Sequence, residues 1–314
     1  MEGLIPTGDP VIDGFINDCI NRGMTIGSTN SYKYAINNFM AFIKTRNIDL
    51  LKVDRKIFVE YINYLRSNKE FTQKTIENQF SALSTLYDYL VYENKLQKNI
   101  VIEIRKRYLR RYKNSYGSGE RRKLINVEEM SGFINSIMYI RDKAIAILLA
   151  KTGIRRGELV RIDIDDIHWD DYHITLKLTP KRSNRIVFFD GECASVLRKW
   201  IKIRNELIGS SNGALFISNT GERLDRSGVY NTIRKWADRY GLYDGKSKKL
   251  EERFSVHCFR HWFTTWLLRN GMPRDYVKEL RGDSRKEAID IYNHIDVEDL
   301  QRAYLAAIPQ FDVY

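Results

Sequence analysis

The segment 141–159, RDKAIAILLAKTGIRRGEL, begins as a mostly apolar stretch and ends in a short charged one. Arg141–Thr152 contains no helix-breaking residue, so its apolar character predicts a helix packed in a core. Gly153 follows at once and is expected to end this helix, because glycine adopts the left-handed backbone of a helix C-cap without strain. The turn behind it would aim Arg155, whose side chain is always charged, into a cleft.

The sequence on both sides of this segment predicts a mixed α/β domain over residues 124–314. Residues 172–178 (YHITLKL) and 185–189 (RIVFF) have the β-branched and aromatic content of strands. They are expected to form a hairpin with Thr179–Asn184 as its polar turn. Helices are predicted near 127–134, 192–208, 225–240, 257–270, 273–281 and 297–307.

The first hundred residues have helical periodicity only. Apolar side chains recur at helical spacing in four stretches, near 11–16, 34–43, 57–65 and 76–90. Ser28 or Thr29 is expected to cap the second helix, and Thr72 or Thr75 the fourth. Residues 1–103 are therefore predicted to form a small all-α domain whose aromatic residues belong to its core rather than to a base-stacking surface.

Residues 104–123, IRKRYLRRYKNSYGSGERRK, separate these two predicted domains. Nine basic residues face a single acid there, and Gly117–Gly119 would interrupt any helix. A solvated linker would explain this composition, but its position between two folded units favours a linker that lies along phosphates. The candidate DNA-contacting residues in it are Arg105, Lys106, Arg107, Arg110, Arg111 and Lys113.

The charge of the whole chain also points to an anionic partner. The formal net charge is +12, which suits nucleic acid or an anionic membrane surface. No stretch is long and apolar enough to span a membrane, and the start of the chain lacks the pattern of a signal peptide. The three cysteines lie far apart without metal-ligand spacing, as in a reducing compartment. We therefore expect a cytoplasmic protein that acts on nucleic acid and not at a membrane.

A set of residues far apart in the sequence has the chemistry for metal-free cleavage of a phosphodiester. Arg155 and Arg260 offer planar guanidinium groups to phosphoryl oxygens, and His257 lies on the same helix face as Arg260. Lys181, at the hairpin tip, would protonate the leaving oxygen. Tyr292 would supply the nucleophilic oxygen. Each residue alone is unremarkable, since arginines after glycine, lysines in turns and HxxR pairs are common on protein surfaces.

Together and in this order, these residues resemble the tyrosine recombinase and phage integrase family. TGIRRGELVRIDIDDI (152–167) is similar to the first box of the family, with Glu158 as the usual companion of Arg155. The hairpin LTPKRSNRIVFF (178–189), the segment VHCFRHWFTTWLLRNGMPRDYVKELRGDS (256–284) and IYNH (291–294) resemble the lysine hairpin, the second box and the nucleophile segment. The helical first hundred residues fit the core-binding domain of the family by architecture alone.

The chain departs from the family pattern in three places. Arg281-Gly282-Asp283 stands where the family usually has Leu-Gly-His, which puts the acidic Asp283 where a phosphate contact is expected. An ionised carboxylate would repel a phosphate, so Asp283 would instead orient Arg260 or His257, or only pack. This form resembles integrases of archaea and their mobile elements. Lys177 is the alternative to Lys181 for the catalytic lysine, and His261, beside Arg260, is secondary.

The resemblance implies a mainly α protein with a small β-sheet, in which an all-α core-binding domain and a mixed α/β catalytic domain clamp double-stranded DNA. It also implies a 3′-phosphotyrosine intermediate at Tyr292, no cofactor or metal, and a homo-tetramer on two DNA sites. The final helix, with Leu300, Tyr304, Leu305 and Ile308, is apolar enough to dock on a neighbouring protomer.

Three rival functions stay open at this point. A type IB topoisomerase-like enzyme would share the chemistry without exchanging strands, and a non-catalytic relative would only bind DNA. A metal-dependent nuclease would use the acidic cluster of Asp163, Asp165 and Asp166 as ligands. A purely structural role explains these acids better, because they follow a short helix at Glu158 and Leu159 and lie in an extended stretch.

Overall fold

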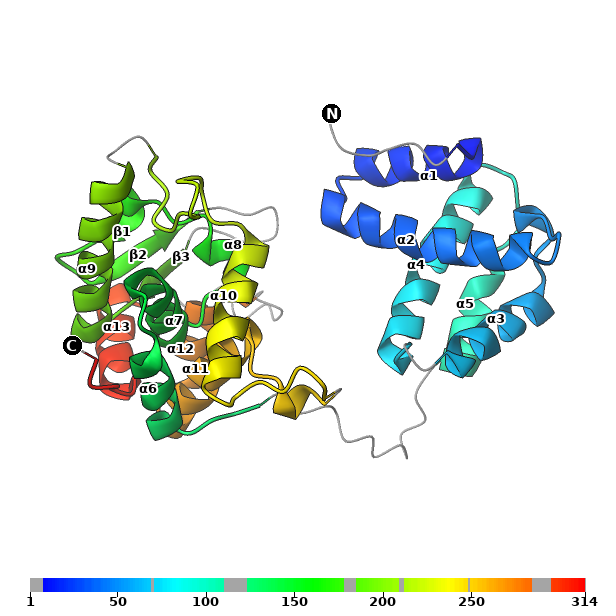
Figure 1. The fold of residues 1–314 in the computed structure, drawn as a ribbon. Coiled ribbons are helices and arrows are strands. Elements are labelled where there is room, and N and C mark those ends of the chain that lie inside the picture. Colours follow the sequence, from blue (N-terminus) through cyan, green and yellow to red (C-terminus); the bar gives the residue numbers. More distant parts are fainter. Residues whose placement is uncertain are drawn as a thin grey trace. The chain divides into compact units, whose positions relative to one another are not determined.

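The computed structural model describes residues 8–68, 71–109, 123–177, 185–208, 212–247, 249–283 and 295–313. The chain divides into two units, Met1–Gly117 and Ser118–Tyr314, each with its own internal contacts. Helices make up most of both units, and a small antiparallel sheet lies in the second (Figure 1). The predicted fold class, mainly α with a small β-sheet, is therefore confirmed.

The four helices predicted in the first unit are present. They are α1 (Pro10–Asn21), α2 (Ile26–Lys44), α3 (Arg55–Ser67) and α4 (Gln73–Tyr92). The expected cap of α2 was wrong by three residues: Thr25 is the N-cap, and its hydroxyl accepts a bond from the Ser28 backbone at 3.3 Å. Thr72, one of the two candidates, caps α4.

The aromatic residues of this unit form its core, as predicted. Phe15, Phe39, Phe58 and Phe80 are fully buried, and Phe39 stacks on Phe58 with their ring centroids 5.2 Å apart. The exceptions on the surface are the exposed Tyr34, Tyr64, Tyr92 and Tyr108.

The helical unit extends further along the chain than the periodicity indicated. A short helix α5 (Ile100–Ile104) and a π-helical turn (Arg105–Leu109) follow α4. Leu109 is buried in the core of this unit, and Arg66 donates to the Tyr108 carbonyl at 3.0 Å. The first six residues of the expected linker 104–123 thus pack with the helices, while residues 110–122 lie outside the described residues.

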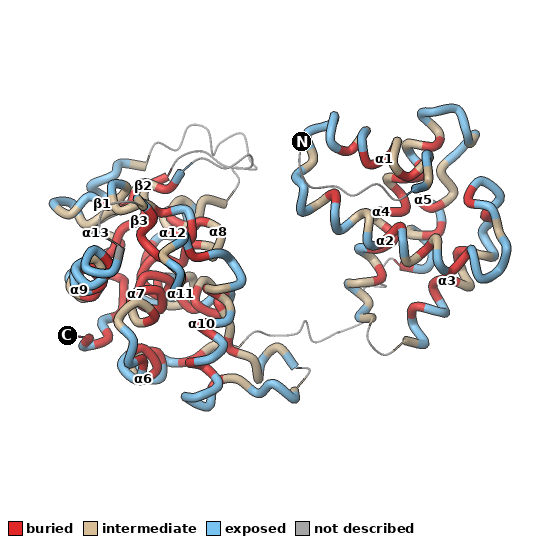
Figure 2. Tube along the Cα trace, turned by 45° about the horizontal axis from the view of Figure 1, so that its top comes forward, coloured by how far each residue is buried: buried red, intermediate tan, exposed pale blue. Residues whose placement is uncertain are grey.

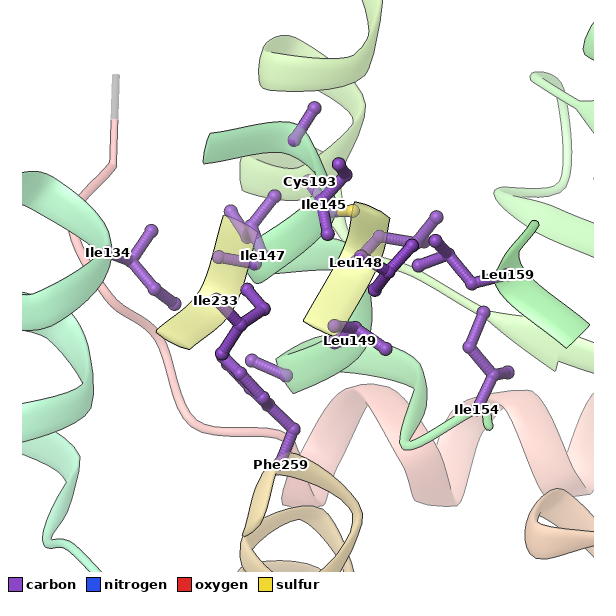
Figure 3. Close-up of a cluster of buried hydrophobic side chains, with 14 of the residues drawn as sticks. Ile134, Ile145, Ile147, Leu148, Leu149, Ile154, Leu159, Cys193, Ile233 and Phe259 are labelled. Carbon is purple, nitrogen blue, oxygen red and sulfur yellow. The ribbon is translucent and has the colours of Figure 1, made fainter. Parts of the chain in front are cut away.

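In the second unit, helix α7 (Ile140–Thr152) runs through the middle of the other elements (Figure 1). Its neighbours include α6, α9, α10, α11 and β3. Ile145, Ile147, Leu148 and Leu149 point outward from it in different directions into one apolar cluster (Figure 3). A helix that is apolar on all sides is stable only when it is surrounded, and every residue from Ala144 to Thr152 is buried (Figure 2).

The remaining elements of this unit agree closely with the predicted ranges. The helices are α6 (Val127–Ser136), α8 (Arg156–Leu159), α9 (Gly191–Ile208), α10 (Arg226–Arg239), α11 (Val256–Arg269), α12 (Arg274–Arg281) and α13 (Val297–Ala307). The helix α8 is the short helix expected at Glu158 and Leu159, although its four residues are too few to show a period.

The predicted hairpin is present as β2 (His173–Leu176) and β3 (Arg185–Phe188). The strands are antiparallel, with Leu176 opposite Arg185 and His173 opposite Phe188. A two-residue strand, β1 (Ile167–His168), adds a third member on the far side of β2. The turn itself, with Lys181, lies outside the described residues.

Three of the four apolar residues expected to dock on a neighbour lie in the core of their own unit, and the fourth, Leu305, is exposed. Leu300, Tyr304 and Ile308 of the α13 region are buried against Phe188, Phe263 and α12 in the same unit. The tail after α13 is held as well, since the fully buried Lys151 donates to the Pro309 carbonyl at 2.7 Å. The interpretation of α13 as a docking helix was therefore wrong for these residues. The helical spacing of these apolar residues indicates a buried face, but it does not show whether that face packs in its own unit or against another protomer.

Candidate active site

The first candidate residue, Arg155, follows a helix end that only glycine can form. Gly153 caps α7 with φ of 58°, and a Cβ at this position would lie 2.4 Å from Cδ1 of Phe263. The chain then turns into α8, and the Arg155 backbone N–H donates to Oε2 of Glu158 at 2.8 Å. The Arg155 side chain remains about a third exposed.

Glu158 is a buried carboxylate held by an arginine of the hairpin. Arg185 donates through Nη1 to Oε1 at 2.8 Å and through Nη2 to Oε2 at 2.9 Å. Burial alone would raise the pKa of Glu158, but the hydrogen bonds and charge of Arg185, with the Arg155 backbone, hold that pKa below its usual value. Arg185 also donates through Nε to the Leu280 carbonyl at 3.1 Å. It therefore ties β3 to α8 and α12.

Arg185 is the residue of this site that sequence reasoning missed. An arginine is unusual at the start of an apolar strand such as RIVFF (185–189). This position was the only sign in the sequence that Arg185 has a buried partner. The bidentate pairing depends on a residue 27 positions away, which no local pattern indicates.

Arg260, on α11, meets Arg155 at the end of α12. Its Nη1 donates to the Gly153 carbonyl at 2.9 Å, and its Nη2 donates to the Arg281 carbonyl at 2.8 Å. Arg155 Nη1 donates to the same Arg281 carbonyl at 3.3 Å. Burial first, then the charges of Arg155 and Arg281, lower the pKa of Arg260 to about 10, so its side chain is still cationic at neutral pH.

Asp283 lies against these arginines. Its Oδ1 accepts from Arg260 Nη2 at 3.2 Å and lies 3.8 Å from Arg155 Nη2. Its Oδ2 lies 3.1 Å from Nε of Arg281. Of the two neighbours that the sequence named for Asp283, Arg260 is the one that the structure shows in contact with it.

The other predicted catalytic residues differ in how far the structure describes them. His257 lies one turn before Arg260 on α11 and is exposed, as is His261. Lys181 and Tyr292 lie outside the described residues, and the site described here consists of the arginines and their neighbours.

Lys177, the alternative to Lys181, is engaged by the acidic cluster. It pairs with Asp163, and its Nζ lies 3.4 Å from Asp166. Asp163 also pairs with Arg223. Although partial burial raises the pKa of Asp163, bonds from Lys177 and Arg223 hold it below its usual value. Asp163 and Asp166 are therefore paired with cations, and no three metal-ligating residues gather within the described parts of the chain.

The predicted DNA-contacting residues are described only in part. Lys106 and Arg107 are exposed, while Arg105 donates to the Ser81 hydroxyl at 3.0 Å. Arg110, Arg111 and Lys113 lie outside the described residues. Among the helices described, none is long and apolar enough to cross a membrane.

The sequence is similar to those of known proteins over most of its length. The Phage integrase family matches residues 122–299, and the phage integrase N-terminal SAM-like domain matches residues 11–95. Tyrosine recombinase XerC of Alcanivorax borkumensis is 30% identical over 247 residues, covering 76% of this chain and 74% of that protein. XerC of Vibrio cholerae is 24% identical over 290 residues, covering 92% of this chain and 89% of that protein.

Solved structures show the same fold. The XerH site-specific recombinase bound to palindromic difH substrate has a TM-score of 0.66 at 23% identity, covering 90% of this chain and 80% of that chain. A lambda integrase (75–356) dimer bound to a COC′ core site has a TM-score of 0.66 at 17% identity, covering 91% of this chain and 98% of that chain. With two arginines gathered at one helix end, a carboxylate companion and these matches, the chain belongs to the phage integrase family of tyrosine recombinases, enzymes of site-specific recombination that cleave and rejoin DNA.

Proposed function

We propose that the protein exchanges strands between two specific sites in double-stranded DNA through a covalent link to Tyr292. The Tyr292 oxygen bonds to phosphorus while the bond to the 5′-oxygen breaks, which leaves a 3′-phosphotyrosine and a free 5′-hydroxyl. Lys181 protonates the leaving oxygen, and Arg155, His257 and Arg260 bind the scissile phosphate. A 5′-hydroxyl of the partner strand then reverses the step.

One observation carries this proposal: guanidinium groups from two segments 105 residues apart converge on the Arg281 carbonyl. Both stay charged at neutral pH, and two guanidinium groups at one place offer the positive charge and the N–H donors that bind a phosphate. A metal is not needed to stabilise the charge on the phosphoryl oxygens, because the two arginines offer that charge themselves.

We also propose the organisation that strand exchange requires. Residues 1–103 serve as the core-binding domain, 124–314 as the catalytic domain, and the basic run 104–123 contacts phosphates between them. Exchange of two duplexes requires four active sites, so a homo-tetramer assembles on two DNA sites. A structural relative, a lambda integrase, is known as a tetramer bound to a Holliday junction.

Two finer assignments belong to the same proposal. The Arg-Gly-Asp form at 281–283 suggests an integrase of an archaeal mobile element. The protein would then act in the cytoplasm, because the chromosome of an archaeal host lies there.

The test is a nicked duplex that carries the recombination site and traps the covalent intermediate by losing the short 5′-hydroxyl strand. We expect a protein–DNA adduct that mass spectrometry maps to Tyr292. An adduct on another residue, or none with a proven site, would contradict the proposal. Recombination of two sites, rather than relaxation of a single supercoiled plasmid, separates this function from a topoisomerase.

A further inference from the structure

The carboxylate of Asp283 lies where an anionic ligand of Arg155 and Arg260 would lie. Its Oδ1 is 3.2 Å from Nη2 of Arg260 and 3.8 Å from Nη2 of Arg155, and Oδ2 is 3.1 Å from Nε of Arg281. One carboxylate thus faces three guanidinium groups. A phosphate offers the same kind of oxygen atoms to the same donors.

The backbone fixes Asp283 in this position. Gly282 ends α12 with φ of 59°, and the Asp283 N–H donates to the Lys278 carbonyl at 3.1 Å. A Cβ on Gly282 would lie 2.8 Å from Cδ of Arg185, so the turn needs glycine for its dihedral angle and for its space. The side chain of Asp283 is therefore directed by the end of a helix and not by a loose loop.

The other carboxylate of the site is already committed to a different partner. Glu158 is bound by Arg185 through both oxygens, and only its 3.4 Å contact with Nη1 reaches the Arg155 side chain. Arg260 is nine-tenths buried among positive charges, and a buried charge is stable only with a counter-charge. Asp283 supplies it.

We propose that Asp283 is an internal counter-anion, which occupies the phosphate-binding atoms of Arg155 and Arg260 in the free protein and is displaced by the DNA phosphate. This inference rests on the proposed function, in which these arginines bind the scissile phosphate. The consequence is selectivity for the substrate. A small free phosphate must compete with a tethered carboxylate, whereas a phosphate of docked DNA is held in place by the remaining contacts of the duplex.

A permanent positioning role for Asp283 would have the opposite effect on anion binding. If Asp283 only held the arginines in their binding geometry, its loss would loosen them and weaken phosphate binding. If it competes, its loss makes phosphate bind more tightly. The sign of one measured change therefore separates the two roles.

The experiment is a calorimetric titration of the full chain with inorganic phosphate at pH 7, for the wild type and Asp283→Asn. Asparagine keeps the size of the side chain and removes its charge. We expect the variant to bind phosphate about tenfold more tightly, the factor expected if Asp283 occupies the arginines in about nine molecules of ten. Adding Arg260→Gln to Asp283→Asn should abolish this binding, which places the phosphate at this site.

The matched control is Asp275→Asn, which removes the same charge from an exposed position in the first turn of α12, where Asp275 pairs with Lys278 at 2.9 Å. It should leave phosphate affinity unchanged. Asp283→Ser is a second variant in case the asparagine protein melts at a much lower temperature, and it should also bind phosphate more tightly. Unchanged or weaker binding by a folded Asp283 variant overturns the inference. The Tyr292 adduct experiment decides the proposed function independently, because it does not depend on free phosphate.

Discussion

At the scale of single residues, the active-site carboxylate Glu158 is held chiefly by Arg185. Arg185 and Glu158 are each less than a tenth exposed, and Arg185 donates two hydrogen bonds to the Glu158 carboxylate. A buried ion pair contributes modestly when intact, but removal of one member leaves an uncompensated charge that costs about 3–5 kcal/mol. The pair therefore supports the placement of Arg155 next to it.

We expect Arg185→Met to destabilise the catalytic unit by about 3–5 kcal/mol at pH 7, because Glu158 stays buried without its partner. The measurement is the urea-unfolding midpoint of the full chain, followed by tryptophan fluorescence. Arg223→Met is the control, since its partner Asp163 is a quarter exposed and such a pair is worth at most about 1 kcal/mol. Equal losses in both variants would contradict the role of burial.

The same pair predicts a pH dependence. The pKa of Glu158 is held below its usual value, so the stability it provides is present above about pH 4.3, the unfolded value, and is lost as the pH falls through the folded pKa. In Arg185→Met the unpaired, buried Glu158 binds a proton more readily than in the unfolded chain. We expect the stability gap between the two proteins to narrow as the pH falls from neutral, first as Glu158 of the variant takes up a proton and then, below about pH 4.3, as the wild type loses its ion pair; urea unfolding at each pH measures this. A constant gap would mean that Glu158 is not the group involved.

Tyr292→Phe tests the bond-forming atom of the proposed reaction. Loss of the phenol oxygen should abolish the covalent adduct, because phenylalanine has no atom that can attack phosphorus. DNA affinity should change little, measured by gel shift at fixed salt, since one hydroxyl is a small part of a large interface. An adduct that persists in this variant would remove Tyr292 from the mechanism.

At the scale of elements, helix ends position the site. The arginines of α7–α8 and α11 both donate to the last carbonyl of α12, where the helix dipole is negative. The two C-caps nearest the site, Gly153 and Gly282, have left-handed backbones and no room for a Cβ. The arrangement therefore depends on where helices stop as much as on which residues they carry.

Gly282→Ala should cost more stability than an ordinary left-handed glycine. A left-handed backbone costs an L-residue about 1–2 kcal/mol, and here the new Cβ would also push against Arg185. Gly241→Ala is the matched control, because Gly241 has φ of 82° with no atom within 4 Å of a built Cβ. The difference between the two melting temperatures measures the steric part. Equal shifts would show that Arg185 moves aside without cost.

At the scale of the whole molecule, charge governs the encounter with DNA. The net charge of +12 and the basic run 105–123 predict that affinity falls steeply with salt. If roughly six to ten phosphates are contacted, affinity should drop about 10³- to 10⁵-fold between about 50 and 200 mM salt. Fluorescence anisotropy with a labelled duplex measures this slope. A flat profile would mean that these charges do not lie on the DNA.

The whole reaction should also proceed without divalent metal. The acids Asp163 and Asp166 are paired with Lys177, and the described residues hold no metal-ligating group of three. We expect cleavage and rejoining in excess EDTA, at most slowed, in the trapped-adduct assay. Loss of cleavage in EDTA with recovery in magnesium would make a metal-dependent nuclease the better explanation.

The sequence by itself determined the longer helices and the strands of the hairpin, and its resemblance to a family pointed to the two arginines of the site. Local periods and stop signals carry this information: Arg141–Thr152 is apolar throughout, and Gly153 can only be a helix end. Asp283 was also recognised from the sequence as a departure from the family pattern, because an acidic residue stands there in place of a histidine.

Only the tertiary structure decided what these residues touch. Arg185 and Glu158 are 27 positions apart, and Arg155 and Arg281 are 126 apart, so their contacts depend on how the elements pack. The apolar face of α13 was visible in the sequence, but whether it entered its own core or a neighbour's was not, because burial has the same pattern in both cases. A period reports that a face is buried, and only the packed chain determines what covers it.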